Sequence, residues 1–261
     1  MSRSRNPDVV ALVLAAGQGT RMKSDLAKVL HRMAGRPMLA FVLAALEELG
    51  VGRTLVVVGY QADRVRAALA EARVEWVLQA EQRGTGHAVQ VAAPALAGFA
   101  GTLLVVYGDT PLLRAATLDA LLAEHRASGA AVTVLSTRVP DPTGYGRILR
   151  GGARGGITAI VEDRDATAEQ RRIDEINTGI GAYQYPALTG VLSGLTAGNA
   201  QGEYYLTDSV RMLLQAGQRA GVVCAPDHRE LLGINTAEQL AEAERLHLEM
   251  KKAVGRAEEA R

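Results

Sequence analysis

Short apolar runs of strand length alternate with helical patterns through the first half of the chain. The runs occupy residues 9–14, 54–58, 74–78, 103–106 and 131–135. Each run is continuous rather than alternating with polar residues, which is typical of strands buried on both faces of a parallel sheet. Between the runs, apolar residues recur at helical spacing over residues 38–49, 65–72 and 118–122. The pattern predicts an α/β fold with a mainly parallel sheet covered by helices.

The pattern changes after about Pro140. Residues 141–163 contain short strand-like segments around a Gly-rich turn, which predicts a small antiparallel subregion on the substrate side. A helix expected over residues 208–216 leads to a strand expected over 221–225, where Cys224 should be buried.

The last helix has a recognisable start. Thr236 is followed three residues later by Gln239, which is the capping-box pattern that opens a helix. We therefore expect one domain over residues 1–235 and a helix that continues from it over residues 236–261.

Composition excludes several classes of protein. The 261 residues include 29 Lys and Arg against 28 Asp and Glu, so a net charge of +1 gives no field that would attract nucleic acid or a membrane surface. The single cysteine excludes an internal disulfide framework and fits a reducing compartment. No apolar stretch is long enough to span a bilayer, and the start lacks a signal peptide's apolar region. We expect a soluble protein of the cytoplasm.

The segment LAAGQGTRM, at the end of the first apolar run, has the composition of a phosphate-binding loop. Gly17 and Gly19 allow close backbone approach to an anion, while Arg21 and Lys28 add positive charge. No Gly-Lys-Ser/Thr follows, so this is not a Walker loop, and Met22 stands where a dinucleotide fingerprint needs a glycine. On its glycines alone, the segment could equally be a turn with solvated basic residues.

The segment LQAEQRGTGHA follows another strand-like run. The Gln79 amide can donate and accept hydrogen bonds, which suits the edge of a nucleobase such as uracil. Gly84, Thr85 and Gly86 would let backbone groups reach the same ligand, although alone the segment could be a loop before a helix. His87 has no evident carboxylate partner, so we interpret it as structural.

Asp109 follows the strand-like run at 103–106, at the carboxyl end where α/β sheets bind ligands. One carboxylate, a second oxygen ligand and triphosphate oxygens would together suit Mg²⁺, although a structural Gly-Asp turn is the alternative. The later half adds the candidates Tyr145, Gly146, Glu162, Asn177 and Asn235, among which the Glu and Asn side chains suit sugar hydroxyls and amides.

Taken together, and in this order, the segments resemble a known family. The motifs are LAAGQGTRM with a lysine six residues on, LQAEQRGTGHA, YGDTPL, DPTGYGRI, IVEDRDA, EINTGI and NAQGEYYLTD. They resemble the uridyltransferase domain of bifunctional N-acetylglucosamine-1-phosphate uridyltransferase/glucosamine-1-phosphate acetyltransferase, from about Val10 to the last helix. The resemblance implies a Rossmann-like nucleotidyltransferase fold.

The resemblance also implies roles for individual residues. The residues expected to contact the nucleotide through their backbone are Leu14, Ala16 and Gly17. The expected catalytic residues, which hold the phosphates, are Arg21 and Lys28. Uracil recognition falls to Gln79, Gly84 and Thr85. The implied Mg²⁺ ligands are Asp109 and Asn235. The N-acetylglucosamine moiety would bind to Gly146, Glu162 and Asn177.

The implied reaction transfers UMP from UTP to N-acetylglucosamine-1-phosphate, a step toward cell-wall precursors, giving UDP-N-acetylglucosamine and pyrophosphate. One alternative is the same chemistry on another sugar-1-phosphate, such as glucose-1-phosphate. Another is a non-catalytic protein that binds nucleotide sugars.

The chain departs from the family in two respects. Ala27 replaces the proline that usually precedes the phosphate-binding lysine. The family's β-helix of hexapeptide repeats, which carries the acetyltransferase and drives trimer formation, is absent, so we expect a monomer. The start MSRSRNPD favours a natural short protein over a truncated one.

Overall fold

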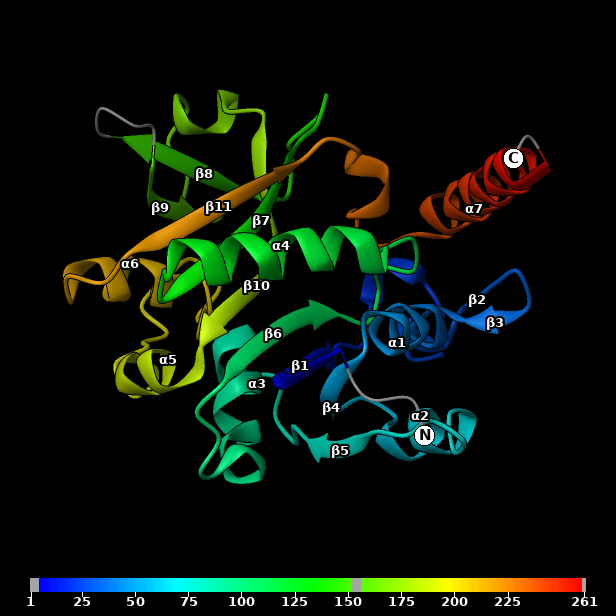
Figure 1. Ribbon diagram of the computed structural model, residues 1–261, viewed down its shortest axis with the longest axis horizontal. Coiled ribbons are helices and arrows are strands. Elements are labelled where there is room, and N and C mark those ends of the chain that lie inside the picture. Colours follow the sequence, from blue (N-terminus) through cyan, green and yellow to red (C-terminus); the bar gives the residue numbers. More distant parts are fainter. Residues whose placement is uncertain (1–4, 152–155, 260–261) are drawn as a thin grey trace.

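A computed structural model describes residues 5–151 and 156–259, with side chains described through residue 251. The start of MSRSRNPD, residues 152–155 of the expected Gly-rich turn and the side chains after residue 251 lie outside the described residues. Within the described chain, nine strands form one mixed sheet with helices on both faces (Figure 1). This arrangement confirms the predicted fold class.

The sheet follows the order β11-β7-β10-β6-β1-β4-β5. Its main strands are β1 (Asn6–Ala15), β4 (Val51–Val58), β5 (Glu75–Leu78), β6 (Thr102–Tyr107), β7 (Val132–Arg138), β10 (Glu175–Gln184) and β11 (Ala220–Ala225). β1 pairs in parallel with both β4 and β6, and β11 pairs in parallel with β7. β10 is antiparallel to both β6 and β7, so it joins the two parallel parts.

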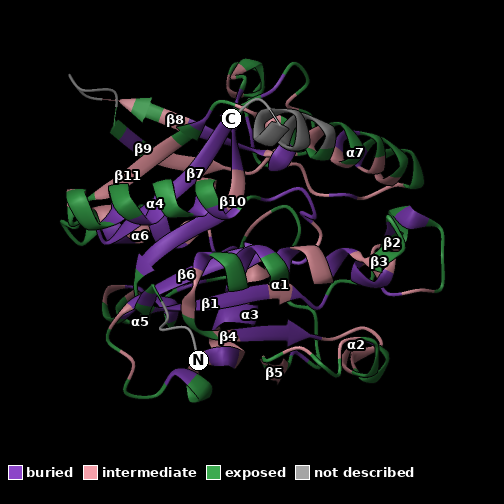
Figure 2. Cartoon of the chain, turned by 45° about the vertical axis from the view of Figure 1, so that its right-hand side comes forward, coloured by how far each residue is buried: buried purple, intermediate pink, exposed green. Residues whose placement is uncertain are grey.

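Residues of β1 alternate between two hydrophobic cores. Val9, Ala11 and Val13 pack in one core, whereas Val10 and Leu12 pack in the other. The helices that contribute to the first core are α1 (Met38–Leu49), α2 (Ala62–Ala68) and α4 (Ala115–Ser128). Those that contribute to the second are α3 (Thr85–Ala92), α5 (Tyr185–Leu192) and α6 (Asp208–Gln215). Figure 2 shows the central strands buried between helices whose outer faces are exposed.

A small antiparallel hairpin extends the sheet where the sequence predicted one. β8 (Gly146–Gly151) pairs with β9 (Gly156–Val161) and also with the start of β10. A second small sheet consists of β2 (Arg32–Met33) and β3 (Arg36–Pro37). Short 3-10 helices occur at η1 (Thr20–Met22), η2 (Lys28–Leu30), η3 (Ala93–Leu96), η4 (Gln170–Arg172) and η5 (His228–Glu230).

The last helix, α7 (Ala237–Glu259), begins where the capping box predicts. The Gln239 amide N–H donates to Thr236 Oγ1 over 3.2 Å, and the Thr236 amide N–H donates to Gln239 Oε1 over 3.2 Å. Ala243 and Leu246 of α7 pack on Met33 in a third, smaller core. The helices of the described residues include none that is long and apolar enough to cross a membrane.

The structure corrects two expectations. β10 was not predicted as a strand, although its later half lies at the centre of the sheet. Cys224 lies in β11 as expected, but its side chain is exposed rather than buried. β11 is an edge strand, and alternation turns Val223 and Ala225 toward the first core and Cys224 away from it.

Glu175, the first residue of β10, is a buried carboxylate at the junction of three strands. It accepts hydrogen bonds from Ser136 Oγ over 2.6 Å and from Arg150 Nε and Nη2 over 2.7 and 2.6 Å. Burial alone would raise the pKa of Glu175, but the hydrogen bonds from Arg150 and Ser136 outweigh it and lower the pKa. Ionised Glu175 therefore holds β10 to β7 and to the hairpin.

We expect Glu175→Gln to lower the free energy of unfolding at neutral pH by roughly 1.5–3 kcal/mol, because it removes a charged hydrogen-bond acceptor. Since the folded pKa is lowered, the stabilisation is present above the usual value near 4.5 and is lost as pH falls through the folded pKa. Urea unfolding from pH 7 to pH 3 should show the deficit shrinking in acid. Asp174→Asn, at an exposed partner of Arg138, should change stability by no more than about 0.5 kcal/mol. An unchanged stability of Glu175→Gln would contradict this account.

Candidate active site

Loops that follow three parallel strands, β6, β1 and β5, meet at the carboxyl edge of the sheet, where β4 lies between β1 and β5. The loop after β1 carries Gly17, the loop after β5 begins at Gln79, and the loop after β6 carries Asp109. Together with Asn235, which precedes α7, they line a cavity of about 390 Å³. Carboxyl edges of this kind are where α/β sheets bind ligands.

Ten of the predicted site residues line this cavity. They are Leu14, Ala16, Gly17, Arg21, Lys28, Gln79, Gly84, Thr85, Asp109 and Asn235. The lining also includes residues that the sequence analysis did not single out, namely Ala15, Val29, Gln82, Ala88, Tyr107 and Glu203.

Charged and amide groups meet at one end of the cavity. Lys28 Nζ forms an ion pair with Asp109 Oδ2 and donates to Asn235 Oδ1 over 2.9 Å. Arg21 Nη2 donates to the same Asn235 oxygen over 2.8 Å. The Ile234 amide N–H donates to the Asp109 carbonyl over 2.9 Å, which ties the segment before α7 to the loop after β6. Both predicted cations therefore contact Asn235 Oδ1, and Lys28 also contacts Asp109.

The oxygens of this cluster suit a small hard cation. Asp109 Oδ2 and Asn235 Oδ1 both contact the single nitrogen Lys28 Nζ, so they converge on one point. Mg²⁺ prefers oxygen ligands and commonly takes only one or two from protein, the rest coming from phosphates and water. Among the residues that the structure describes, no cluster of three or more His, Cys, Asp or Glu side chains could hold a metal alone. The residues present thus fit a cation shared with phosphate.

Gln79 follows β5, three strands away from β6 in the sheet order, so it lines the end of the cavity away from the Asp109 loop, and it is held firmly. Its amide N–H donates to the Val58 carbonyl over 2.8 Å, and its side chain is only 3% exposed. Its Nε2 donates to the Gly84 carbonyl over 3.1 Å and lies 3.1 Å from His87 Nδ1. His87 is therefore a hydrogen-bond neighbour of a predicted base-reading side chain.

The Gly84 loop is joined to a segment distant in sequence. The Gly86 amide N–H donates to the Tyr204 carbonyl over 2.7 Å, and the Tyr204 amide N–H donates to the Arg83 carbonyl over 2.9 Å. The Leu206 amide N–H donates to Thr85 Oγ1 over 3.0 Å. The Arg83 guanidinium also stacks over the Tyr204 ring, 5.1 Å from its centroid.

The three predicted sugar-binding residues form a second group beside the cavity. Gly146 of β8 pairs with Asn177 of β10. A Cβ on Gly146 would lie 3.3–3.4 Å from the Glu162 carboxylate oxygens, so Glu162 lies close over this pair. Thr207 Oγ1 donates to Glu162 Oε1 over 2.9 Å. Burial raises the pKa of Glu162, the Thr207 hydrogen bond lowers it, and nearby Asp165 raises it further, for a net rise.

Tyr107 lies between the two groups and was not predicted. It lines the cavity, and its pKa is raised by burial first and then by the negative charges of Glu162 and Asp109, among others. Gly179 of β10 has φ +80°, and a Cβ there would overlap the Tyr107 ring. Tyr107 lies two residues before Asp109 in the sequence, and this position was the signal that could have identified it.

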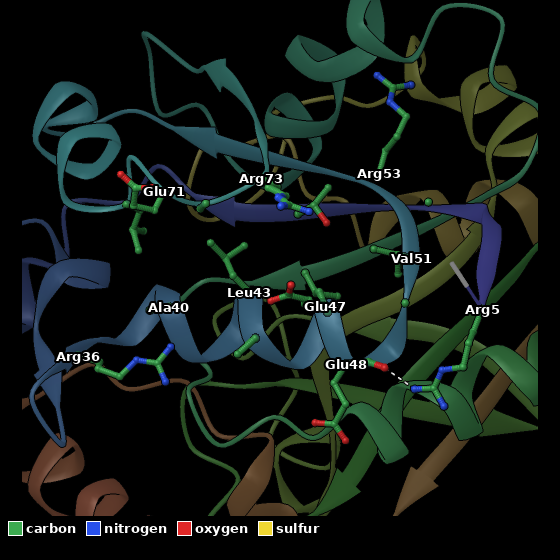
Figure 3. Close-up of a pocket in the computed structure, with 17 residues that line it drawn as sticks. Arg5, Arg36, Ala40, Leu43, Glu47, Glu48, Val51, Arg53, Glu71 and Arg73 are labelled. Atoms are coloured by element: carbon green, nitrogen blue, oxygen red, sulfur yellow. Dashed lines mark hydrogen bonds between the residues drawn. The ribbon is translucent and has the colours of Figure 1, made fainter. Parts of the chain in front are cut away.

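A larger cavity, of about 870 Å³, lies elsewhere (Figure 3). It is lined by the first residues of β4, by α1, and by both arginines and glutamates such as Arg73 and Glu47. The Arg5 guanidinium donates to the Glu48 carbonyl at its rim. Val51 begins β4, so this cavity lies at the amino end of that parallel strand, opposite the loops described above.

The fold and this site are those of a nucleotide-dependent transferase. The chain belongs to the family of the MobA-like NTP transferase domain, whose model matches residues 11–176. It is 52% identical over 252 residues to "Bifunctional protein GlmU" of Thermobifida fusca (strain YX), covering 94% of this chain and 51% of that protein. It is 50% identical over 242 residues to the protein of that name from Syntrophotalea carbinolica, covering 93% and 52%. The chain thus spans about half the length of these curated relatives.

The fold has a solved counterpart. The crystal structure of UDP-glucose pyrophosphorylase complexed with UDP-glucose superposes with a TM-score of 0.72, covering 92% of this chain and 98% of that one. The sequence identity is 19%, so this likeness concerns the fold.

We predict that Gly84→Ala disrupts the connection between the Gly84 loop and the segment around Tyr204. Gly84 has φ 104° and ψ 175°, and a Cβ there would lie 2.6 Å from the Tyr204 carbonyl oxygen. This backbone conformation is essentially restricted to glycine, so the variant should lose roughly 1–3 kcal/mol of stability. Hydrogen exchange should speed up at the Gly86 and Leu206 amides. Gly17→Ala is the matched control, because a Cβ there meets nothing within 4 Å. Retained protection in Gly84→Ala would contradict this prediction.

Proposed function

We propose that the protein transfers UMP from UTP to N-acetylglucosamine-1-phosphate, giving UDP-N-acetylglucosamine and pyrophosphate. The observation that carries the proposal is the convergence of Lys28, Arg21, Asp109 and Asn235 at one end of a cavity whose other end holds Gln79. Two cations and two oxygen donors suit a triphosphate with Mg²⁺, and a buried amide suits a base edge. The relatives named bifunctional protein GlmU and the sequence motifs support the same reading.

The nucleotide would lie along the cavity between these two ends. Backbone groups of Leu14, Ala16 and Gly17 would contact it, and Gly84 and Thr85 would complete the uracil site with Gln79. Thr85 begins α3, where the helix dipole favours polar and negative ligand groups. Arg21 and Lys28 would pair with phosphate oxygens.

Lys28 and Arg21 would serve the chemical step mainly by neutralising charge. A phosphate oxygen of the sugar phosphate attacks the α-phosphorus of UTP in line, and the bond to the bridging oxygen breaks as pyrophosphate leaves with the electron pair. No general base is needed, because the attacking phosphate is already ionised near neutral pH. Catalysis of this kind rests on positioning and electrostatic stabilisation. Mg²⁺ held by Asp109 and Asn235 would supply further charge neutralisation when bound.

The sugar would bind beside Tyr107, at Gly146, Glu162 and Asn177. Glu162 is a partly buried acceptor with one oxygen already bonded to Thr207, so it presents a fixed carboxylate. Asn177 Oδ1 accepts from the Gly179 amide over 3.2 Å, which orients its amide nitrogen as a donor. A fixed acceptor and a fixed donor suit the hydroxyl and N-acetyl groups of the sugar.

Asp109→Ala should lower the rate of pyrophosphate release by roughly 100-fold or more, because it removes a charge that organises the phosphate site. The assay is pyrophosphate release from UTP and Mg²⁺ with N-acetylglucosamine-1-phosphate, glucosamine-1-phosphate or glucose-1-phosphate as acceptor. Asp119→Ala, on the exposed surface of α4, is the control and should retain the wild-type rate.

Each outcome of this assay has a defined meaning. Preference for the acetylated sugar supports the proposal, and preference for glucose-1-phosphate keeps the chemistry but overturns the substrate. A folded wild-type protein that binds UTP and releases no pyrophosphate with any acceptor is a binding protein rather than an enzyme. Near-wild-type activity of Asp109→Ala would overturn the metal assignment.

Glu162 should make binding of the sugar phosphate dependent on pH. Its pKa is raised, so the carboxylate that accepts from the sugar becomes protonated as pH falls toward that pKa, at a higher pH than for an ordinary glutamate. KM for N-acetylglucosamine-1-phosphate should therefore rise in acid. In Glu162→Gln, KM should already be high at neutral pH, by roughly tenfold, and should lose this component of the pH dependence. Comparing the two proteins cancels the titration of the substrate itself, and identical pH profiles would contradict the assignment.

A further inference from the structure

We infer that His87 is a positioning residue that sets the preference for uracil over cytosine by fixing the amide orientation of Gln79. The inference rests on the proposed function, since it assumes that Gln79 faces the base of a bound nucleotide. It adds His87, a side chain outside the lining of the cavity, to the determinants of specificity.

Both hydrogens of the Gln79 amide nitrogen are occupied. Nε2 donates to the Gly84 carbonyl oxygen and contacts His87 Nδ1, each over 3.1 Å. A primary amide nitrogen has two hydrogens, so none remains for a ligand. No described residue donates to Gln79 Oε1, and Gln79 lines the cavity. The carbonyl oxygen is therefore the end of the amide that is available to a base.

The reversed amide orientation is unfavourable for electrostatic reasons. It would place Gln79 Oε1 against the Gly84 carbonyl oxygen and against His87 Nδ1. Gln79 Oε1, itself a hydrogen-bond acceptor, would then face two further acceptors. The arrangement also requires an unprotonated Nδ1, which assigns His87 the tautomer with its proton on Nε2. His87 lies in the first turn of α3, and its ring centroid is 6.4 Å from that of Tyr204.

An available carbonyl oxygen distinguishes the two pyrimidines. Uracil carries a hydrogen on N3 and can donate to Gln79 Oε1, whereas N3 of cytosine has a lone pair that would face the same oxygen. Gly84 opposes amide reversal through a loop carbonyl, and His87 adds a second acceptor on a helix. Without His87, the amide loses one of its two anchors and can turn more readily toward cytosine. Sites that read hydrogen-bonding groups discriminate well only when their own groups are fixed.

The test compares two substitutions of similar size. His87→Leu removes the acceptor, while His87→Asn retains an acceptor at the position of Nδ1. We expect the ratio of kcat/KM for UTP to that for CTP to fall roughly three- to tenfold in His87→Leu and to stay within about twofold of wild type in His87→Asn. Gln79→Leu provides the reference for complete loss of amide reading.

A purely structural role for His87 would lower both activities and leave the ratio unchanged, and that result would overturn the inference. Equal loss of the ratio in His87→Leu and His87→Asn would also overturn it, because ring volume rather than hydrogen bonding would then matter. The inference would also be overturned if the wild-type protein did not prefer UTP to CTP.

Titration of UTP and CTP without a sugar phosphate separates this inference from the proposed reaction. If the wild-type protein does not catalyse the reaction, the proposed function fails, and the ratio of the two dissociation constants across the same variants still tests His87. ¹⁵N chemical shifts of His87 in the wild-type protein give a measurement that needs no variant to fold. A proton on Nδ1 would overturn the inference, and a proton on Nε2 would support it.

Discussion

The pairing of β1 with a parallel strand on each side is the constraint on which the site depends. Leu14 is in register with Val57 of β4 and with Tyr107 of β6, and Val57 is in register with Val77 of β5. The four strands therefore end at nearly the same level. Because β1 is buried on both faces, a slip of one residue would exchange the two cores. The register that packs the cores is thus the one that brings three functional loops together.

β10 connects the proposed nucleotide side of the sheet with the proposed sugar side. Its first residues pair with β7 and, at Asn177, with β8, whereas its later residues pair with β6 and β7. The pairing with β7 is irregular between Asn177 and Gly181, and Gly179 adopts a positive φ within that interval. The strand can therefore change partners along its length and leave room for the ring of Tyr107. β10 thereby carries Asn177 beside the cavity, and its pairing with β8 holds the hairpin whose second strand, β9, ends just before Glu162.

The strands and site residues that depend on local sequence patterns could be predicted from the sequence. Continuous apolar runs identified β1, β4, β5, β6 and β7. Strand ends followed by glycine or charge pointed to seven residues of one cavity, namely Gly17, Arg21, Lys28, Gln79, Gly84, Thr85 and Asp109, whereas Leu14 and Ala16 were expected only from the family resemblance. β10 escaped prediction because its sequence, EINTGIGAYQ, mixes apolar residues with a carboxylate, two amides and two glycines. The buried Glu175 is tolerated only because Ser136 and Arg150 come to it from other strands. The contact of His87 with Gln79 could not be predicted from the sequence, because it depends on how the loop at Gly84 folds back.

In the cluster around Asn235, the side chains of the proposed phosphate site are already held in place before any ligand binds. Lys28 is mostly buried and would be costly to leave uncompensated, but Asp109 and Asn235 satisfy it. Asn235 Oδ1 also accepts from Arg21, so one amide oxygen holds two cations in place without cancelling their charge. When a triphosphate binds, Lys28 and Arg21 would exchange their contacts with Asp109 and Asn235 for contacts with phosphate oxygens. Their side chains would not first have to be ordered. Side chains that are fixed in advance lower the cost of binding. A neutral amide fixes Lys28 and Arg21 without cancelling their positive charge, so it is better suited here than a second carboxylate.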